Sequence, residues 1–379
     1  MALIFALLKT FPRFRMWSSP IGLVVVCLAL GLSSLATNVN HLIITQGIMY
    51  AIGGGLAWTP VLFFIEEWWV RRRGFAYGAV IAGAGLGGAV IPVMTELLLH
   101  SYGFRTTLRI IAIAFAALNF PLLFFFKPRL PLSQTALHRG FDMSFWKCRT
   151  FLILQSGNIL QSLGYFLPSI YLPTYARSLG ASGLASMVPV VLLNGAAFVG
   201  SLCMGIAVDK YHVTTCLFVS TIGSTIGTFL IWGVSTSLPP LYIFCLIYGA
   251  FAGSTSSSWS AVVRETKEKR RGADSGMIFA CLSLGKGIGN LCSGPLSEAL
   301  LHAGGWKAGL AYGSGYGALI VFTGVTGVLG GWSIAARRIG WLWCQLQLRL
   351  DVVGISWYGV LGSENGKEDC DSYIHYSIP

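Results

Sequence analysis

The residue of greatest chemical interest in this chain is a lysine that lies among apolar and small residues. Lys286 is part of LSLGKGIGN, and Asn290 follows one helical turn later. In a helix that crosses a membrane, a central lysine costs at least about 2.5–3.5 kcal/mol, so it normally faces a cavity or a partner. Two interpretations remain open. Lys286 meets an anionic substrate or a transported proton, or it is a structural or interfacial lysine.

Amide and aromatic side chains form a second group of candidates for a substrate path. Gln155, Asn158 and Gln161 recur at a spacing of three, so they share part of one helix face and predict a polar stripe along a cavity. The isolated candidates are Gln46, Tyr50, Asn194 and Trp259. For each of these residues, the alternative is a hydrogen bond or a packing contact that joins two helices.

The residue types that usually carry catalysis or bind metals form no cluster in the sequence. The nine Cys residues show no C-x-x-C or zinc spacing, and the six His residues form no H-E-x-x-H motif. The run from Gly83 to Gly88 satisfies G-x-G-x-x-G, but a dinucleotide site also needs a preceding strand and a later acidic residue, and neither is present. We therefore expect no cofactor, no metal and no enzymatic activity.

Long uncharged segments indicate the fold class. Apolar residues make up 54% of the 379 residues and charged residues 11%, whereas soluble domains carry roughly 25% charged residues. A run of about 18 apolar residues crosses a hydrocarbon core about 30 Å thick, and its backbone must then be helical. We expect an all-α membrane protein with about ten transmembrane helices. The expected spans are Ile21–Thr37, His41–Ile65, Gly74–His100, Leu108–Phe126, Phe151–Tyr175, Ala185–Val208, Val213–Ser235, Pro240–Val263, Gly272–Leu296 and Ala308–Ile334.

The basic residues indicate which side of the membrane each loop occupies. The loops on one side hold most of the 26 Lys and Arg residues, whereas the opposite loops hold only Arg105, Arg109, Arg177 and Lys307. Basic loops stay in the cytoplasm during insertion, so the net charge of +12 reflects topology and not a nucleic-acid partner. We expect a multi-pass protein in the lipid bilayer of the plasma membrane or of an organelle.

Charged turns at the expected cytoplasmic side are candidates for a gate. The residues concerned are Glu66, Glu67, Arg71, Arg72, Arg73, Asp209, Lys210, Arg270 and Arg271. Glu66 or Glu67 against the three arginines would form a charge latch, and the alternative is solvated loop charges worth under about 1 kcal/mol. The pattern R-R-G-x-x-x-G at Arg72–Gly78 recurs at Arg270–Gly276, which indicates an internal repeat of the kind that two-bundle transporters show.

Small residues after the first arginine turn predict close helix packing. Gly74, Gly78 and Ala82 follow one another at a spacing of four, as do Gly83 and Gly87. Residues four apart lie on one face of a helix, and small side chains there let a second helix approach closely.

These segments resemble a known family. GIMYAIGGGLAWTPVLFFIEEWWVRRRGFAYGAVIAGAGLGGAVIP resembles the fourth and fifth helices of the major facilitator superfamily, and in detail its monocarboxylate-transporter-like branch, especially fungal members. YGFRTTLR, PSIYLPTYARSLG, LLNGAAFVGSLCMGIAVDK and GKGIGNLCSGP resemble later helices of those proteins in the same order. The resemblance covers roughly Phe11 to Ile334. It implies two six-helix bundles, a central cavity and alternating access.

The chain also departs from that family. Its first full span resembles the family's third helix, so we expect the first two helices to be absent, together with the lysine that animal monocarboxylate transporters carry in the first. The aspartate–arginine pair of their eighth helix is absent too, because Ala185–Val208 holds no charge. Gly205-x-x-x-Asp209-Lys210 resembles a degenerate form of the superfamily's loop signature, in which an aspartate meets a helix N-terminus.

Together these features predict the domains and a function. We expect a helical bundle of about four spans at 1–126, a cytoplasmic connecting loop at 127–150, a six-helix bundle at 151–336 and a cytoplasmic tail at 337–379. The expected function is secondary transport of a small-molecule substrate, an organic solute such as a monocarboxylate, with proton coupling left open. The competing hypothesis is a non-transporting membrane protein, either a sensor or the product of a truncated gene.

Overall fold

The computed structural model describes residues 2–11, 13–127, 129, 143–270, 272–302 and 309–339. Residues Met1–Trp341 group into one compact unit, and Leu342–Pro379 form a second unit that lies outside the described residues. Most of the expected connecting loop, most of the expected tail and Arg271 also lie outside them. We call residues 2–127 the first half of the chain and residues 143–339 the second half.

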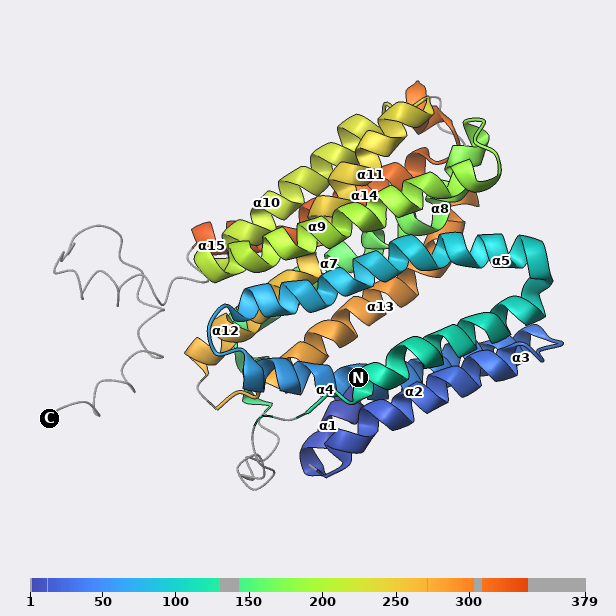
Figure 1. Cartoon of the computed structure of the whole chain (residues 1–379). Helices are drawn as coiled ribbons and strands as arrows, with labels where there is room; N and C mark the ends of the chain where they lie inside the picture. Colours follow the sequence, from blue (N-terminus) through green and yellow to red (C-terminus); the bar gives the residue numbers. More distant parts are fainter. Residues whose placement is uncertain are drawn as a thin grey trace, which may run out of the picture. The chain divides into compact units, whose positions relative to one another are not determined.

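Every regular element in the described residues is helical (Figure 1). The first half consists of α1 (Ala2–Thr10), α2 (Phe14–Ser33), α3 (Val39–Leu42), α4 (Tyr50–Trp68) and α5 (Arg73–Leu123). The second half consists of α7 (Arg149–Tyr165), α8 (Leu167–Ser178), α9 (Val188–Lys210), α10 (Val213–Ile226), α11 (Leu238–Ala252), α12 (Trp259–Lys269), α13 (Ser275–His302), α14 (Gly317–Gly330) and α15 (Ser333–Arg338). Short 3-10 or π segments join several of these helices.

Among the described residues, each of the ten expected spans lies mainly on helical segments, which confirms the all-helical fold class. Seven helices in the described part of the chain are long and apolar enough to cross a membrane. Helix α5 contains two of the expected spans. A kink at Gly103, whose φ is positive at 73°, separates them. Helices α7 and α8 together make one span. The break falls just before Pro168, which lacks a backbone N–H and therefore suits the first turn of α8.

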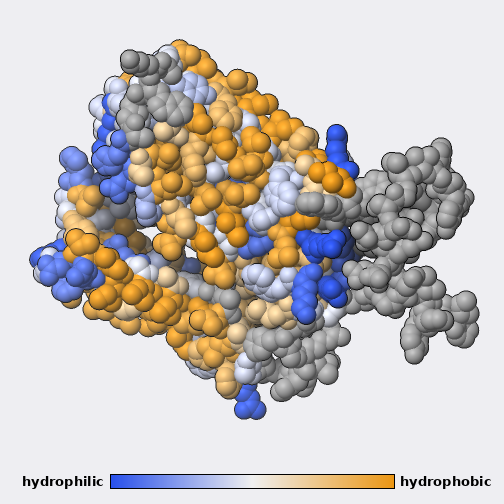
Figure 2. Space-filling view, turned by 180° about the vertical axis from the view of Figure 1, so that it is seen from behind, coloured by the Kyte–Doolittle hydropathy of each residue, from blue (hydrophilic) through white to orange (hydrophobic). Residues whose placement is uncertain are grey.

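Hydrophobic residues cover the face shown in Figure 2, and hydrophilic residues gather at its two ends. Such a surface suits a bilayer, whose core excludes charge. The loops rich in Lys and Arg mark one end of the helices, around Arg15, Arg71–Arg73, Lys210 and Arg264–Arg270. We call this the basic end.

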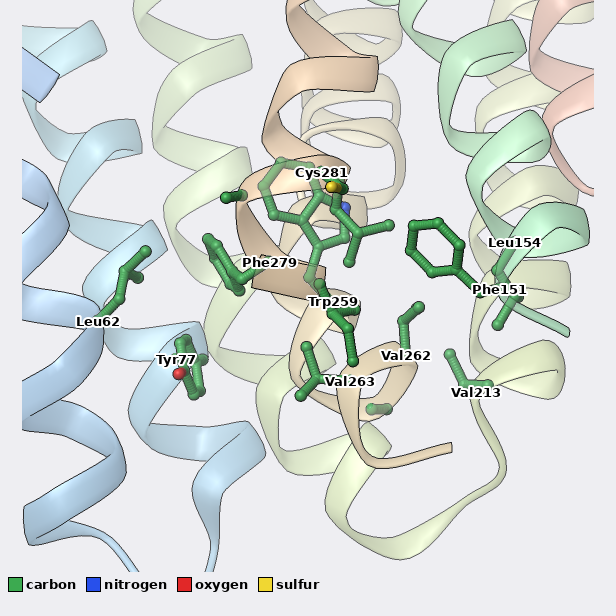
Figure 3. Packing of buried hydrophobic residues seen from close by; sticks show 14 of the residues in the cluster. Leu62, Tyr77, Phe151, Leu154, Val213, Trp259, Val262, Val263, Phe279 and Cys281 are labelled. Carbon is green, nitrogen blue, oxygen red and sulfur yellow. The ribbon is translucent and has the colours of Figure 1, made fainter. Parts of the chain in front are cut away.

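The two halves share a hydrophobic core at the basic end. That core joins Leu62 and Tyr77 of the first half to Trp259, Val262 and other residues of the second half (Figure 3). A second core, which includes Trp232, belongs to the second half alone. The most extensive contact between the halves runs along α5 and α9, which lie side by side (Figure 1). A shared core at one end is the arrangement that a gate between two bundles requires.

Candidate functional site

Lys286 lies near the middle of α13. It is 11 residues from Ser275, which corresponds to about 16 Å of helix at 1.5 Å per residue. Its Nζ donates to Ser256 Oγ at 2.5 Å and lies 4.4 Å from the centroid of the Tyr165 ring and 5.8 Å from that of Trp259. Within the described ranges, no carboxylate lies within 4.0 Å of Nζ. A half-buried ammonium group is therefore held by a hydroxyl and two aromatic rings, without a counter-charge.

The amide residues of α7 do not form one continuous stripe along a large cavity. Gln155 Nε2 donates to Cys281 O at 2.8 Å, and Asn158 Nδ2 donates to Leu282 O at 2.9 Å. Both carbonyls belong to the turn of α13 that precedes Lys286, so these two amides join α7 to the helix that carries the lysine. The interhelical alternative thus describes both residues.

Unlike the other two α7 amides, Gln161 makes no side-chain hydrogen bond in the described part of the chain. It lines a cavity of about 20 Å³ inside the second half, together with Asn158, Ser258 and Trp259. Helix α7 packs against α13 through Gln155, Ile159 and Ser162, and against α14 through Gly157, Gln161 and Gly164, so two of its faces meet different neighbours. A space of that size holds about one water molecule and no organic solute.

The other sequence candidates lie at varied positions. Asn290 Oδ1 is buried without a hydrogen-bond partner among the described residues. Asn194 Nδ2 donates to Val190 O within its own helix at 3.0 Å. Gln46 and Tyr50 are exposed, and neither makes a side-chain hydrogen bond to the described part of the chain. The structure therefore places Trp259 beside Lys286 and Asn290 one turn further along the same helix, whereas Asn194, Gln46 and Tyr50 make no contact with the lysine among the described residues.

Aromatic rings close the space between Lys286 and the basic end. Tyr77 of α5 stacks on Phe279 of α13 with the ring centroids 5.5 Å apart, and Trp259 meets Phe279 edge-on at 5.1 Å (Figure 3). Tyr77 and Phe279 come from different halves, so separating the halves would part this pair. Sequence reasoning missed both residues. The only signal was that Phe279 precedes Lys286 by seven residues, which places it two turns away on the same side of α13.

A carboxylate links the halves at the basic end. Asp209, at the end of α9, accepts hydrogen bonds from the backbone N–H groups of Gly74 at 2.8 Å and Phe75 at 2.9 Å. These N–H groups have no helical partner because they open α5, and a carboxylate also suits the positive end of the helix dipole. The preceding residue, Arg72, has a positive φ of 56°, a conformation that costs a non-glycine residue roughly 1–3 kcal/mol.

The glycines that pack α5 against α9 differ in part from the expected set. A Cβ atom on Gly78 would lie 2.7 Å from Ser201 O, and Gly74 is similarly close to Gly205 O, while Ala82 is fully buried. The expectation for Gly83 and Gly87 is wrong, because neither approaches another helix. Gly85 and Gly88 take that role beside Phe198 and Asn194. The spacing of four holds for Gly74 and Gly78, but the next two glycines that meet α9, Gly85 and Gly88, are three residues apart.

The acidic residues of the arginine turn form other pairs than the expected latch. Glu67 makes a buried ion pair with Arg15 at 3.0 Å, and Glu66 accepts from the Tyr77 hydroxyl at 3.3 Å. Arg73 Nε donates to Trp69 O at 3.0 Å. In the described residues, none of the three turn arginines lies within 4.0 Å of either glutamate. Glu67 thus pairs with Arg15 in place of the turn arginines, whereas Arg73 acts on Glu66 only at longer range, so the latch stays a prediction.

The remaining gate candidates show no such pairing. Lys210 and Arg270 are exposed. Neither makes a side-chain hydrogen bond or ion pair in the part of the chain that the structure describes. Arg271 lies outside the described residues. Their part in a gate stays a prediction.

The sequence profile of the Major Facilitator Superfamily matches residues 3–148 and 154–339. The chain belongs to this superfamily. Several curated proteins from fungi are similar to it in sequence. The MFS transporter asaE of Aspergillus flavus is 28% identical over 313 residues, which cover 82% of this chain and 68% of the relative. The aspyridones efflux protein apdF of Emericella nidulans is 27% identical over 283 residues, 74% of this chain and 56% of the relative.

Solved structures of the superfamily agree with this fold. The proton:xylose symporter XylE bound to 6-bromo-6-deoxy-D-glucose superposes with a TM-score of 0.63 at 17% identity, over 90% of this chain and 82% of that one. At this identity the likeness concerns the fold alone. The chain spans between 56% and 74% of the length of the curated relatives it matches.

Proposed function

We propose that this superfamily member is a secondary transporter of small organic anions, with Lys286 as the residue that meets the anionic group. This proposal rests on the environment of Lys286. The ammonium group lies at mid-helix depth beside Ser256, Tyr165 and Trp259, with no carboxylate within 4.0 Å in the described residues. A structural lysine at that depth would normally have an acidic partner.

The interactions present offset only part of the cost of burying the charge. A cation–π contact contributes about 0.5–2 kcal/mol, and a hydrogen bond to a charged group contributes about 1.5–3 kcal/mol. Removing an ammonium group from water costs several kcal/mol per ion. An anionic substrate would supply the missing counter-charge while its apolar body contacts Tyr165 and Trp259. Substrate binding would then be coupled to the charge state of the site.

The relatives support export of an organic product. One of them is named as an efflux protein for aspyridones, and others are named as transporters from filamentous fungi such as Aspergillus flavus. A carboxylate-bearing product fits both the Lys286 site and the resemblance to the monocarboxylate-transporter-like branch. That branch, coupling to protons and the absence of the family's first two helices stay predictions. Because the chain spans only part of the length of its relatives, transport is proposed for the complete protein.

The conformation of the structure supports alternating access. The halves meet at the basic end through Asp209 and through the Tyr77–Phe279 pair. Lys286 lies on the other side of that aromatic layer, further along α13. A substrate at Lys286 would therefore be closed off from the cytoplasm in this state, and separating the halves at the basic end would release it there or admit it from there.

Two probes of similar shape and different charge test this proposal. Benzenesulfonate is anionic and benzenesulfonamide is neutral, and the binding of each to purified protein is measured by isothermal titration calorimetry. We expect the wild type to prefer the anion. We expect Lys286→Met to lose that preference by at least tenfold, about 1.4 kcal/mol. Lys210→Met removes an exposed positive charge at the basic end and should change the preference by less than twofold.

Transport is measured as efflux of radiolabelled benzenesulfonate from preloaded proteoliposomes. Faster efflux than from protein-free vesicles, slowed in Lys286→Met, supports the proposal. An anion preference that survives in Lys286→Met would overturn the site. Saturable binding without efflux would overturn transport of these anions and favour the non-transporting alternative.

A further inference from the structure

A separate cavity of about 620 Å³ opens at the basic end of the molecule. The first half contributes its walls from the end of α4 and the start of α5, and the second half contributes walls from α9, α12 and α13. The Tyr77 ring lies between this cavity and the interior. The charged residues that line it are Glu66, Arg71, Arg72, Arg73, Asp209, Arg264, Lys267 and Glu268.

Positive charge exceeds negative charge in this lining, with five cations against three carboxylates. Two of the carboxylates are already engaged by neutral donors. Asp209 accepts from the first N–H groups of α5, and Glu66 accepts from the Tyr77 hydroxyl. Among the residues that the structure places, no lining cation lies within 4.0 Å of either of these two carboxylates. Glu66 acts on Lys267 and Arg73 at longer range, but the lining still holds two more cations than carboxylates.

Several cationic groups have donors to spare. Arg264 uses one terminal nitrogen to donate to Val208 O at 2.9 Å, which leaves the rest of its guanidinium group. Lys267 Nζ donates to Ser275 Oγ at 2.7 Å and keeps two further hydrogens. Arg71 and Arg72 make no side-chain hydrogen bond to described residues. A planar guanidinium group binds phosphate oxygens in pairs, and several such groups together favour a multivalent anion over a single carboxylate.

We propose that this cavity binds a phosphate group, carried either by a soluble phosphate compound or by an anionic lipid headgroup. The anion would bridge Arg71–Arg73 of the first half and Arg264 with Lys267 of the second half. Because the two sets belong to different halves, separation of the halves would break the bridge. Bound phosphate therefore stabilises the closed basic end. At a ligand concentration one hundred times the Kd, the ratio of closed to open protein rises about a hundredfold if only the closed state binds.

Titration calorimetry on the full chain tests binding without requiring transport. Purified protein in 150 mM salt is titrated with inorganic pyrophosphate. In a second arm, protein in nanodiscs with phosphatidylinositol 4-phosphate is compared with protein in phosphatidylcholine alone, and competition by the lipid against pyrophosphate is measured. Binding of pyrophosphate without lipid competition identifies a soluble ligand, and competition identifies the headgroup. Absence of binding in both arms overturns the proposal, whatever the outcome at Lys286.

Charge-matched variants separate the cavity from general attraction. Arg71→Gln with Arg264→Gln removes one lining cation from each half and should weaken binding at least tenfold. Lys210→Gln with Arg338→Gln removes the same charge from exposed positions outside the lining and should weaken it less than threefold. Equal weakening in the two double variants would overturn the site, because it would indicate unspecific attraction.

A distance measurement tests the effect on the gate. Spin labels at Phe11→Cys and Tyr211→Cys, in protein otherwise free of cysteine, report the separation of the halves at the basic end. Both positions are exposed. Pyrophosphate should shift the distance distribution toward its shorter component in the parent protein and not in the Arg71→Gln, Arg264→Gln variant. A distribution that pyrophosphate leaves unchanged would overturn the bridging role.

Discussion

The cap that Asp209 provides across the two halves makes a quantitative prediction about gating. Both of its carboxylate oxygens accept backbone N–H groups of α5, from Gly74 at 2.8 Å and Phe75 at 2.9 Å. When the basic end opens, water replaces the carboxylate at these N–H groups. Asp209 therefore stabilises the closed state relative to the open state by the free energy of a helix cap, about 1–2 kcal/mol. Asp209→Asn keeps one acceptor and loses the charge, which corresponds to about 1 kcal/mol. Asp209→Ala loses both, which corresponds to about 2 kcal/mol.

These free energies translate into populations of the open state. At 1.36 kcal/mol per factor of ten, Asp209→Asn should raise the open fraction about fivefold and Asp209→Ala about thirtyfold. A cysteine at Ala261, which is buried in the shared core and lines the basic-end cavity, reports the opening. Its alkylation rate by N-ethylmaleimide, in protein otherwise free of cysteine, is proportional to the open fraction when opening is fast.

Arg338→Gln serves as the control. It removes an exposed charge that is not among the gate candidates and should alter the alkylation rate by less than twofold. An Asp209→Ala rate within twofold of the parent would refute the reasoning, as would an equal rise in Arg338→Gln. Size-exclusion chromatography and circular dichroism establish that the variants are folded, so that faster alkylation reports gating and not unfolding.

Two further predictions concern packing and positioning. Gly205→Ala should cost about 1–3 kcal/mol and lower the Tm in detergent, because its Cβ atom would lie 2.7 Å from a carbonyl oxygen of α5. Gly83→Ala, whose Cβ atom meets nothing within 4 Å, should not lower it, and equal losses would contradict the assigned interface. Gln155→Leu removes the hydrogen bond to α13 and should cost about 1 kcal/mol of the anion preference at Lys286, measured by calorimetry. Gln161→Leu should leave that preference unchanged, and a larger effect there would place the site elsewhere.

Much of the architecture could be predicted from the sequence alone. Uncharged segments of sufficient length must become helices in lipid, so the expected spans lie mainly on helical residues in the described part of the chain, even where Phe166 interrupts one of them. The basic turns marked one end of the molecule, and the isolated Lys286 drew attention because a charge at that depth needs a reason. The resemblance to the superfamily's loop signature also predicted that Asp209 meets the N-terminus of a helix. All of these inferences depend on local properties of the chain.

Only the tertiary structure decided which groups meet. Glu67 pairs with Arg15, 52 positions away, and not with the arginines next to it. Gln155 and Asn158 of α7 donate to α13, whereas Gln161 packs against α14. Helix α9 meets Gly85 and Gly88 in place of Gly83 and Gly87. The physical reason is the same in each case. Helical periodicity determines which side chains share a face, but the neighbour that covers that face depends on how separate helices pack together.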